Sequence, residues 1–213
     1  FNSDFFIYLK NSLIVSFSSM IISIILSVSA AYGLHKLKFY GNKFVEYSLL
    51  VTYAFPGVIL LVPIYLLFAK VNLLNSYFAL IIVNVLFATP FAVWMLKAFF
   101  KLIPNEIEEA AYIDGASRYV VISRIVIPLA APGIMVGSLL SFVLAAGAMS
   151  ESKILGGQSV IVIADDIETA FTFGQNWPLG ASLSMVLIAI ISALAIYGIS
   201  KINLDEILGK RKI

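Results

Sequence analysis

Apolar residues run continuously through five long segments of the chain. The segments cover residues 12–34, 47–69, 77–100, 129–149 and 178–200. A helix that crosses a bilayer core of about 30 Å needs roughly 20 residues, and each segment has about that length. The runs are continuous rather than alternating, which disfavours a β-barrel. The pattern therefore predicts an all-α fold, a polytopic membrane helix bundle with five transmembrane helices in this chain.

Two of the predicted spans contain prolines. Pro56 and Pro63 lie in the second span and Pro90 lies in the third. Prolines are tolerated in membrane helices, where they mark kinks, so we expect kinks at these positions. Between the fourth and fifth spans, residues 150–177 are too many for a turn, and their apolar run is too short to span. We expect a structured extracytoplasmic loop there, for which a re-entrant path stays open.

The composition agrees with a membrane protein. Hydrophobic residues make up 61% of the chain, charged residues 12%, and the mean hydropathy is +1.01. A soluble domain commonly carries about 25% charged residues. The net charge of +2 is too small to indicate a nucleic-acid partner. Because the chain has no cysteine and His35 is its one histidine, we expect neither a disulfide nor a His/Cys metal site.

The basic residues are distributed unevenly along the chain. Eleven of the fourteen follow the first span, lie between the third and fourth, or belong to the C-terminal tail: Lys36, Lys38, Lys43, Lys97, Lys101, Arg118, Arg124, Lys201, Lys210, Arg211 and Lys212. Lys and Arg are enriched in cytoplasmic loops, so we expect these three regions to face the cytoplasm. An outer N-terminus and an odd number of spans then predict one further helix before Phe1, in a six-helix parent protein.

Residues 101–128, between the third and fourth spans, predict a helix–turn–helix elbow. Asn105 can cap a helix, and Glu108 completes a capping-box pattern. Gly115 can end this helix in a left-handed conformation, and Ser117 can cap a second one before Pro128. A plain connection needs about two to eight residues. A solvated connection is the alternative. The length of the segment and the small apolar face of its first helix favour instead an elbow on which a cytoplasmic partner docks.

One spacing inside this segment resembles the EAA motif of ABC importer permeases. The family pattern is E-A-A-x3-G-x9-I-x-L-P. This chain follows it with Glu109-Ala110-Ala111, then Gly115 after three residues, then Ile125 after nine more, and finally Ile127-Pro128. The one difference is Ile127, where leucine is usual. The stretches "NSLIVSFSSMIISIILSVSAAYGLHKLKF" and "FPGVILLVPIYLLFAKVNLLNS" resemble the carbohydrate (maltose-type) branch. "AAGAMSESK" departs from the Trp-Asn-Glu-like stretch common in sugar permeases, and "NWPLGASLS" resembles polyamine-type permeases.

The resemblance implies a single transmembrane permease domain over residues 1–213, with a cytoplasmic coupling loop over 101–128 and the extracytoplasmic loop over 150–177. It implies that an ATPase subunit docks on Glu109, Ala110, Ala111, Asp114, Gly115, Arg118, Ile125 and Pro128. It further implies a second permease subunit, two ATP-binding-cassette ATPase subunits that bind ATP and Mg, an extracytoplasmic solute-binding protein, and a place among the lipids of a prokaryotic cell membrane. No cofactor and no catalytic residue are expected in this chain.

The implied function is import of a sugar or oligosaccharide, with a polyamine or another small solute as the alternative. "LGGQSV" is glycine-rich but lacks the Gly-Lys-Ser/Thr of a phosphate-binding loop, so ATP hydrolysis is expected in a partner. Candidate substrate-path residues are polar or aromatic groups inside spans: Tyr53, Asn84, Thr89, Trp94 and Ser141. An interhelical hydrogen bond for Asn84 and plain packing for Trp94 are the alternatives. Two other classes of function are an intramembrane enzyme and a scaffold protein that has no ATPase partner. An intramembrane enzyme would need paired ionisable residues inside the spans, and the spans lack them.

Overall fold

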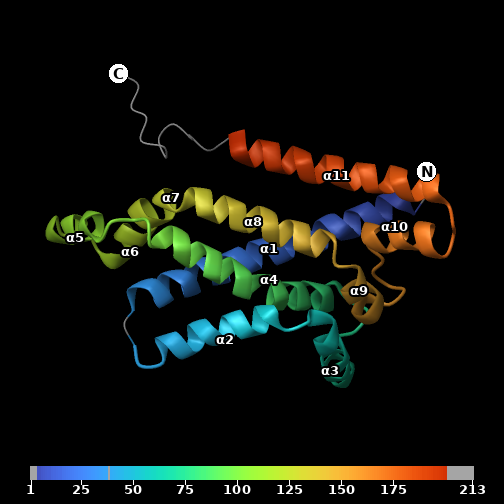
Figure 1. Cartoon of the computed structure of the whole chain (residues 1–213), viewed down its shortest axis with the longest axis horizontal. Coiled ribbons are helices and arrows are strands. Elements are labelled where there is room, and N and C mark those ends of the chain that lie inside the picture. Colours follow the sequence, from blue (N-terminus) through green and yellow to red (C-terminus); the bar gives the residue numbers. More distant parts are fainter. Residues whose placement is uncertain (1–3, 38, 201–213) are drawn as a thin grey trace.

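The computed structural model describes residues 4–37 and 39–200, which form helices and no strand. The long helices α1 (Phe5–Lys36), α4 (Tyr77–Phe100) and α8 (Ala131–Ala146) pack together at the centre (Figure 1). The remaining elements are α2 (Asn42–Ala54), α3 (Gly57–Lys70), α5 (Asn105–Ile113), α6 (Arg118–Val121), the π-helical turn η1 (Ile122–Val126), α7 (Ile127–Leu129), α9 (Met149–Glu151), the π-helical turn η2 (Ser152–Gly156), α10 (Ile163–Thr172) and α11 (Trp177–Ser200). The all-α prediction is confirmed.

Three helices are long and apolar enough to cross a membrane: α1, α4 and α11. Two further spans are bent pairs, in which α3 turns by 98° from α2 and α8 turns by 71° from residues 118–129. With each pair counted as one span, length and composition give five, as predicted. The first bend falls at Pro56, which has no N–H and separates α2 from α3. Helix α4, in contrast, continues unbroken through Pro90.

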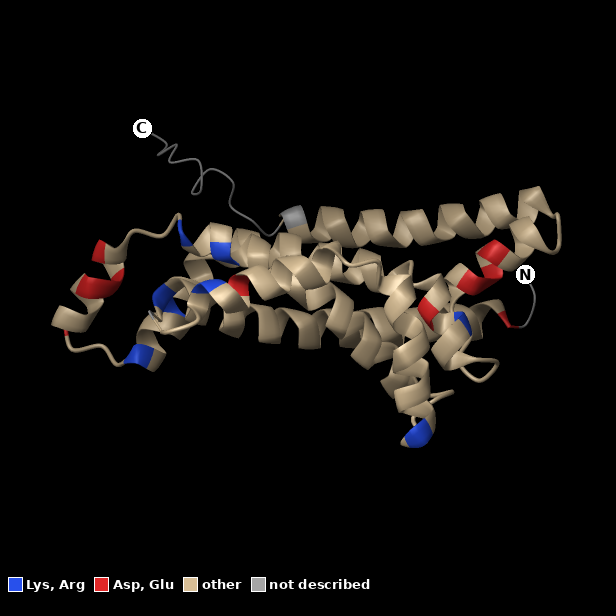
Figure 2. Cartoon of the chain, turned by 60° about the horizontal axis from the view of Figure 1, so that its bottom comes forward, with Lys and Arg blue, Asp and Glu red and all other residues tan. Residues whose placement is uncertain are grey.

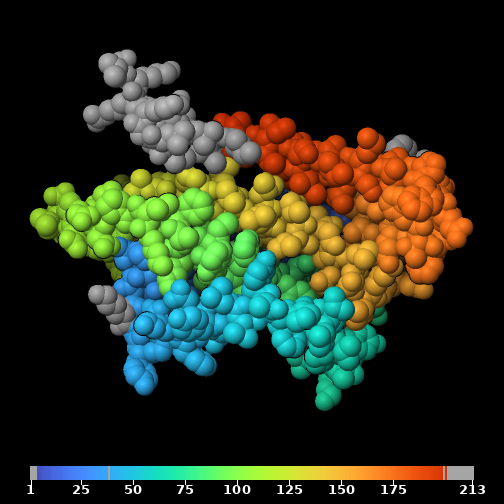
Figure 3. Space-filling model, viewed as in Figure 1, coloured from blue at the N-terminus to red at the C-terminus, as the bar shows by residue number. Residues whose placement is uncertain are grey.

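The connections that were predicted to lie on opposite sides of the membrane are found at opposite ends of the bundle. Helices α5 and α6 form one end, near the connection from α1 to α2, and α9 and α10 lie at the other (Figures 1 and 3). Most of the basic positions gather toward the end that carries α5 and α6 (Figure 2). Lys38 and the tail from Lys201 to Lys212 lie outside the described residues, and the cytoplasmic placement of all these basic regions stays a prediction.

Helix α1 presents a stripe of serines to the interior of the bundle. Its members, all buried, are Ser12, Ser16, Ser19, Ser23 and Ser27. Small side chains let neighbouring helices approach closely. The Ser23 hydroxyl lies 3.3 Å from that of Thr89 on α4, and the Ser27 hydroxyl donates to the Thr89 carbonyl at 3.4 Å. Ser23 and Ser27 of the stripe thus contact α4.

The segment over residues 150–177 is structured, as expected. Its extended part and α10 pack on the N-terminal part of α1 and on α4. Asp165 is buried, where it accepts hydrogen bonds from the Ser152 hydroxyl at 2.6 Å and the Val162 N–H at 3.3 Å. Burial raises the pKa of Asp165 above its ordinary value in spite of these hydrogen bonds, which lower it. Lys153 and Glu168 form an ion pair nearby.

Candidate functional site

The elbow turns at Gly115, as the sequence predicts. Gly115 has φ +84°, a left-handed conformation that suits glycine. The Ala116 N–H bonds to the Ala111 carbonyl at 2.9 Å, and the Gly115 N–H bonds to the Tyr112 carbonyl at 3.0 Å. These two bonds close the end of α5 in a Schellman motif. The Ser117 hydroxyl then accepts from the Val120 N–H at 3.5 Å and caps α6.

The start of α5 differs from the prediction. Asn105 is the first helical residue rather than the cap, because Pro104 occupies the preceding extended position, and no side chain caps the helix. The Asn105 side-chain oxygen instead accepts from the Lys36 amine at 2.6 Å. A charge-assisted bond of this kind is stronger than one to a neutral amide N–H. The predicted capping box is therefore not formed.

Glu108 also turns inward. Its residue is only 4% exposed, and its Oε1 lies 2.8 Å from the Nζ of Lys36. The Tyr32 hydroxyl donates to the other carboxylate oxygen at 3.4 Å. Lys36 and Tyr32 belong to the last turns of α1, so Glu108 and Asn105 join α5 to that helix end. We call these four residues the inner anchor.

The EAA-like residues divide between the outer and the inner surface of α5. Glu109 and Ala110 are exposed, whereas Ala111 is partly buried against the apolar cluster beneath the elbow. Ile113 is 86% exposed, and Tyr119 on α6 is 79% exposed. Exposed apolar side chains in a contiguous area commonly mark an interaction surface. The outer face of the elbow thus combines a free carboxylate, a small alanine and uncovered apolar groups.

The other predicted docking residues form two groups. Asp114 and Gly115 are exposed at the turn, and Arg118 is exposed at the start of α6, where it lines a cavity of about 530 Å³ with Glu109 and the inner anchor. Ile125 lies partly buried in η1, and Pro128 is exposed in α7, just before the 71° bend. A π-helical turn often marks a functional position in a helix. Ile125 and Pro128 therefore lie at the bend between the elbow and the span.

Two of the candidate substrate-path residues come together. Tyr53 and Asn84 line a cavity of about 200 Å³ at the bend between α2 and α3, beside Gly57 and Thr52. The α4 residues that line it fall near the middle of that span, because α4 runs from Tyr77 to Phe100. The Asn84 amide donates to the Leu80 carbonyl of its own helix at 2.8 Å, rather than to another helix.

Thr89 and Ser141 lie elsewhere, whereas Trp94 lines a second cavity, of about 130 Å³, together with Tyr53. The Thr89 hydroxyl donates to the Val85 carbonyl at 2.6 Å and faces the serine stripe of α1. Ser141 is buried in α8. Trp94 is half-exposed and packs on Phe91, whose ring stacks on Tyr53 at a centroid distance of 4.9 Å. The structure therefore brings Tyr53 together with Asn84 in one cavity and with Trp94 in another, but it does not bring the five residues into one site.

Sequence reasoning missed Glu151 and the inner anchor. Glu151 lines the cavity that Tyr53 and Asn84 also line, which we call the span cavity, and its side chain forms no ion pair or hydrogen bond with the part of the chain that the structure describes. The sequence feature that could have revealed Glu151 is the position of this carboxylate directly after the apolar fourth span. For the inner anchor, Asn105 and Glu108 are three residues apart, which places them on one helix face. No local pattern, however, identifies Lys36 as their partner.

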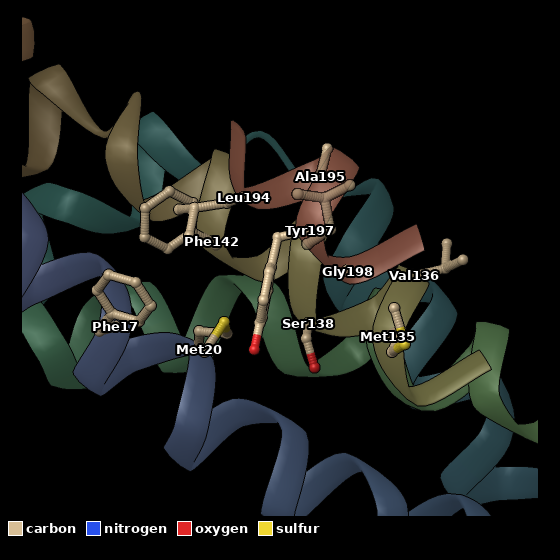
Figure 4. Close-up of a pocket in the computed structure, with 11 residues that line it drawn as sticks. Phe17, Met20, Met135, Val136, Ser138, Phe142, Leu194, Ala195, Tyr197 and Gly198 are labelled. Atoms are coloured by element: carbon tan, nitrogen blue, oxygen red, sulfur yellow. The ribbon is translucent and has the colours of Figure 1, made fainter. Parts of the chain in front are cut away.

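A separate apolar groove lies between α1, α8 and α11. Its volume is about 330 Å³, and Phe17, Met20, Met135, Phe142 and Leu194 line it together with Tyr197 and Ser138 (Figure 4). No charged side chain is among these described lining residues. The groove is therefore suited to hydrocarbon rather than to a polar solute.

Comparison with known proteins relates the chain to membrane components of transport systems. The family described as "Binding-protein-dependent transport system inner membrane component" matches residues 23–205. The inner membrane ABC transporter permease protein YcjP of Escherichia coli K12 is 40% identical over 60% of this chain and 46% of its own length. The sulfoquinovosyl glycerol transport system permease protein SmoH of Agrobacterium fabrum is 37% identical over 64% of this chain and 48% of its own. The chain thus matches about half the length of these relatives.

Solved structures share the fold. A chain of the MetNI methionine ABC transporter, in an inward-facing conformation, superposes with a TM-score of 0.77. The match covers 93% of this chain and 96% of that one at 17% identity. At that identity the likeness shows the arrangement of helices and not the transported solute.

Proposed function

The chain belongs to the family of binding-protein-dependent transport system inner membrane components, and we propose that it is the permease subunit of an ATP-binding-cassette importer. In this role it forms part of the translocation path together with a second permease subunit. Two separate ATPase subunits bind ATP and Mg, and an extracytoplasmic protein delivers the solute. The observation that carries the proposal is the elbow, whose exposed face combines the Glu109 carboxylate with Ala110 and Ile113.

The elbow is suited to receive a cytoplasmic partner. Glu109 projects a charge from a surface that also exposes Ala110 and Ile113. Small residues let a partner surface approach closely, and a carboxylate can form a charge-assisted bond with a basic side chain of that partner. The segment of η1 and α7 connects this surface to α8. A movement imposed on the elbow can therefore reach a membrane span.

The transported solute in this proposal is a sugar or oligosaccharide. The relative SmoH is named for transport of sulfoquinovosyl glycerol, a sugar derivative. The span cavity supports the same class, because its Tyr53, Asn84 and Glu151 offer a ring face, an amide and a carboxylate to hydroxyl groups. Its position near the middle of α4, where α2 and α3 break, is typical of substrate sites in transporters.

Co-expression with an ATP-binding subunit of the same transport system tests the proposal. We expect the two to purify together from detergent and, after reconstitution with the second permease, to take up a labelled oligosaccharide when ATP is supplied. A chain that reaches the membrane but retains no ATP-binding subunit would contradict the permease assignment. Uptake that proceeds without ATP would contradict it equally.

A cationic solute such as a polyamine is the second candidate, because Glu151 has no cationic partner among the described residues. Hydrogen bonds to charged groups contribute about 1.5–3 kcal/mol, so Glu151→Gln should reduce uptake of a cation roughly 10- to 100-fold. Uptake of a neutral sugar should fall much less, since glutamine still accepts hydrogen bonds. Labelled putrescine and a labelled disaccharide, compared in wild type and variant, distinguish the two classes.

Gly115→Val should weaken ATPase binding and uptake while the spans stay folded. A β-branched residue at φ +84° costs about 1–3 kcal/mol of backbone strain. Nothing lies within 4 Å of a Cβ built at this position, so strain rather than a clash is the cause. Gly115→Asn is the matched control, because asparagine tolerates left-handed conformations. Equal assembly and uptake in the valine and asparagine variants would refute the role of the turn.

The proposed orientation places the elbow in the cytoplasm and the segment over 150–177 outside. The chain has no cysteine, so single introduced cysteines report position without background. Ser117 and Ser159 are both exposed. In intact cells an impermeant maleimide should label Ser159→Cys, whereas Ser117→Cys should react only after permeabilisation. Reaction of Ser117→Cys in intact cells would reverse the orientation.

A further inference from the structure

Helix α1 is fastened at both of its ends to segments outside the bundle's centre. At one end, Lys36 and Tyr32 hold Glu108 of the elbow helix α5 through the inner anchor. At the other end, the Asn11 amide donates to the Ile161 carbonyl at 2.8 Å, and the Ser12 hydroxyl accepts from the Ile163 N–H at 2.8 Å. We call these two hydrogen bonds the outer anchor. Tyr32, Glu108, Asn11 and Ser12 are buried and Lys36 is partly buried, whereas Asn105 is exposed.

The apolar packing follows the same pattern. Near the elbow, Tyr32 packs in a cluster with Val121 and Val126 of the segment that leads from the elbow into α8. Near the outer anchor, Val15 packs in a cluster with Val160 and Val162. One helix therefore contributes to the core beneath the elbow and to the core beneath the outer segment.

Helix α1 is also built to move as one piece. It is continuous from Phe5 to Lys36 and contains no proline, whereas two of the other spans are bent pairs and α4 holds Pro90. From Ser12 to Lys36 it extends about 36 Å at 1.5 Å per residue. Its contact with α4 runs along the serine stripe, where the Ser16 and Ser19 hydroxyls are buried with no hydrogen-bond partner in the described chain. Packed helices can slide past one another by small shear movements, and short side chains hinder this little.

We propose that α1 transmits movement between the elbow and the outer segment over residues 150–177. Lys36 and Glu108 at one end, and Asn11 and Ser12 at the other, act as positioning residues in this transmission. This inference rests on the proposed permease function, because it requires an ATPase subunit that moves the elbow. It assigns to α1 a link between the side where ATP is used and the side where a solute-binding protein would arrive.

The experiment uses the reconstituted complex with its ATPase subunits, in which Ser159→Cys reports on the outer segment. The rate of maleimide labelling is measured without nucleotide and with ATP, Mg²⁺ and vanadate, so no solute needs to be known. With both anchors intact, nucleotide should change the labelling rate. The inner-anchor variant Lys36→Met with Glu108→Leu, and the outer-anchor variant Asn11→Ala with Ser12→Ala, should each lose this change while the ATPase subunit still co-purifies.

Two controls make the result specific. Ser152→Ala removes a hydrogen bond within the outer segment and should alter the basal labelling rate but keep the response to nucleotide. The exchanged pair Lys36→Glu with Glu108→Lys restores opposite charges and should recover the response. A persistent response in either anchor variant, or none in the intact complex, would overturn the inference. Loss of the ATPase subunit from the inner-anchor variant would overturn it too, whereas absence of that subunit from the intact complex would refute the permease function itself.

Discussion

Glu109→Lys is expected to leave the chain folded and inserted while it removes most ATPase binding and ATP-driven uptake. Glu109 is exposed on α5, and its carboxylate makes no ion pair with the described residues. Helix-dipole stabilisation of an exposed carboxylate in a first turn is only about 0.3–1 kcal/mol. Glu109 is the fifth residue of α5 and lies beyond that turn, so even this contribution is small.

The loss at a docked interface should be much larger. Removing one partner of a buried interfacial charge pair costs about 2–5 kcal/mol, which is roughly thirty- to several-thousand-fold in affinity. Lysine adds repulsion against a basic partner. The measurements are co-purification of the ATPase subunit, ATP-driven uptake, and helix content by circular dichroism.

Glu106→Lys is the matched control for Glu109→Lys. Glu106 is exposed on the same helix, in its first turn and outside the EAA-like spacing. We expect it to reduce assembly only slightly. If the two lysine variants show equal and mild effects, the carboxylates act through the helix dipole and Glu109 has no docking role. An acidic substitution in the ATPase cleft that restores binding to Glu109→Lys would identify the contact directly.

The sequence predicts the spans well because hydropathy depends on local composition. The third span was expected over 77–100, and α4 runs from Tyr77 to Phe100. The first span was expected to begin near residue 12, yet α1 begins at Phe5. Polar residues such as Asn11 end a hydropathy window, but the helix continues because Asn11 finds partners in the outer segment and in Tyr77. Such distant partners are invisible to a local pattern.

The elbow shows the same division between local and distant information. Gly115 and Ser117 were predicted correctly, because a glycine turn and a serine cap need only their neighbours. The capping box failed because Lys36, more than sixty positions earlier, competes for Asn105 and Glu108. Likewise, Pro56 indicates a kink, but the 98° angle that opens the span cavity depends on the packing of α2 and α4.

Lys36→Met should destabilise the chain strongly, because it leaves the Glu108 carboxylate buried without a cation. Breaking a buried pair from one side costs about 3–5 kcal/mol, and the lower end applies because the Lys36 side chain keeps 19% of its exposure. Lys43→Met is the control, since Lys43 carries the same charge on the neighbouring helix α2 without an ion pair among the described residues. Thermal unfolding of the purified protein measures both variants.

The double variant Lys36→Met with Glu108→Leu should recover most of this loss, because an apolar pair of similar size needs no desolvation of charge. The two variants therefore distinguish an effect on stability from an effect on transmission. The single variant unfolds more readily, whereas the double variant is stable but lacks the ionic link between α1 and α5. If Lys36→Met is no less stable than Lys43→Met, the Glu108 carboxylate is hydrated in the folded protein. The inner anchor would then be too weak to hold the elbow on α1, and the proposed transmission through α1 would fail with it.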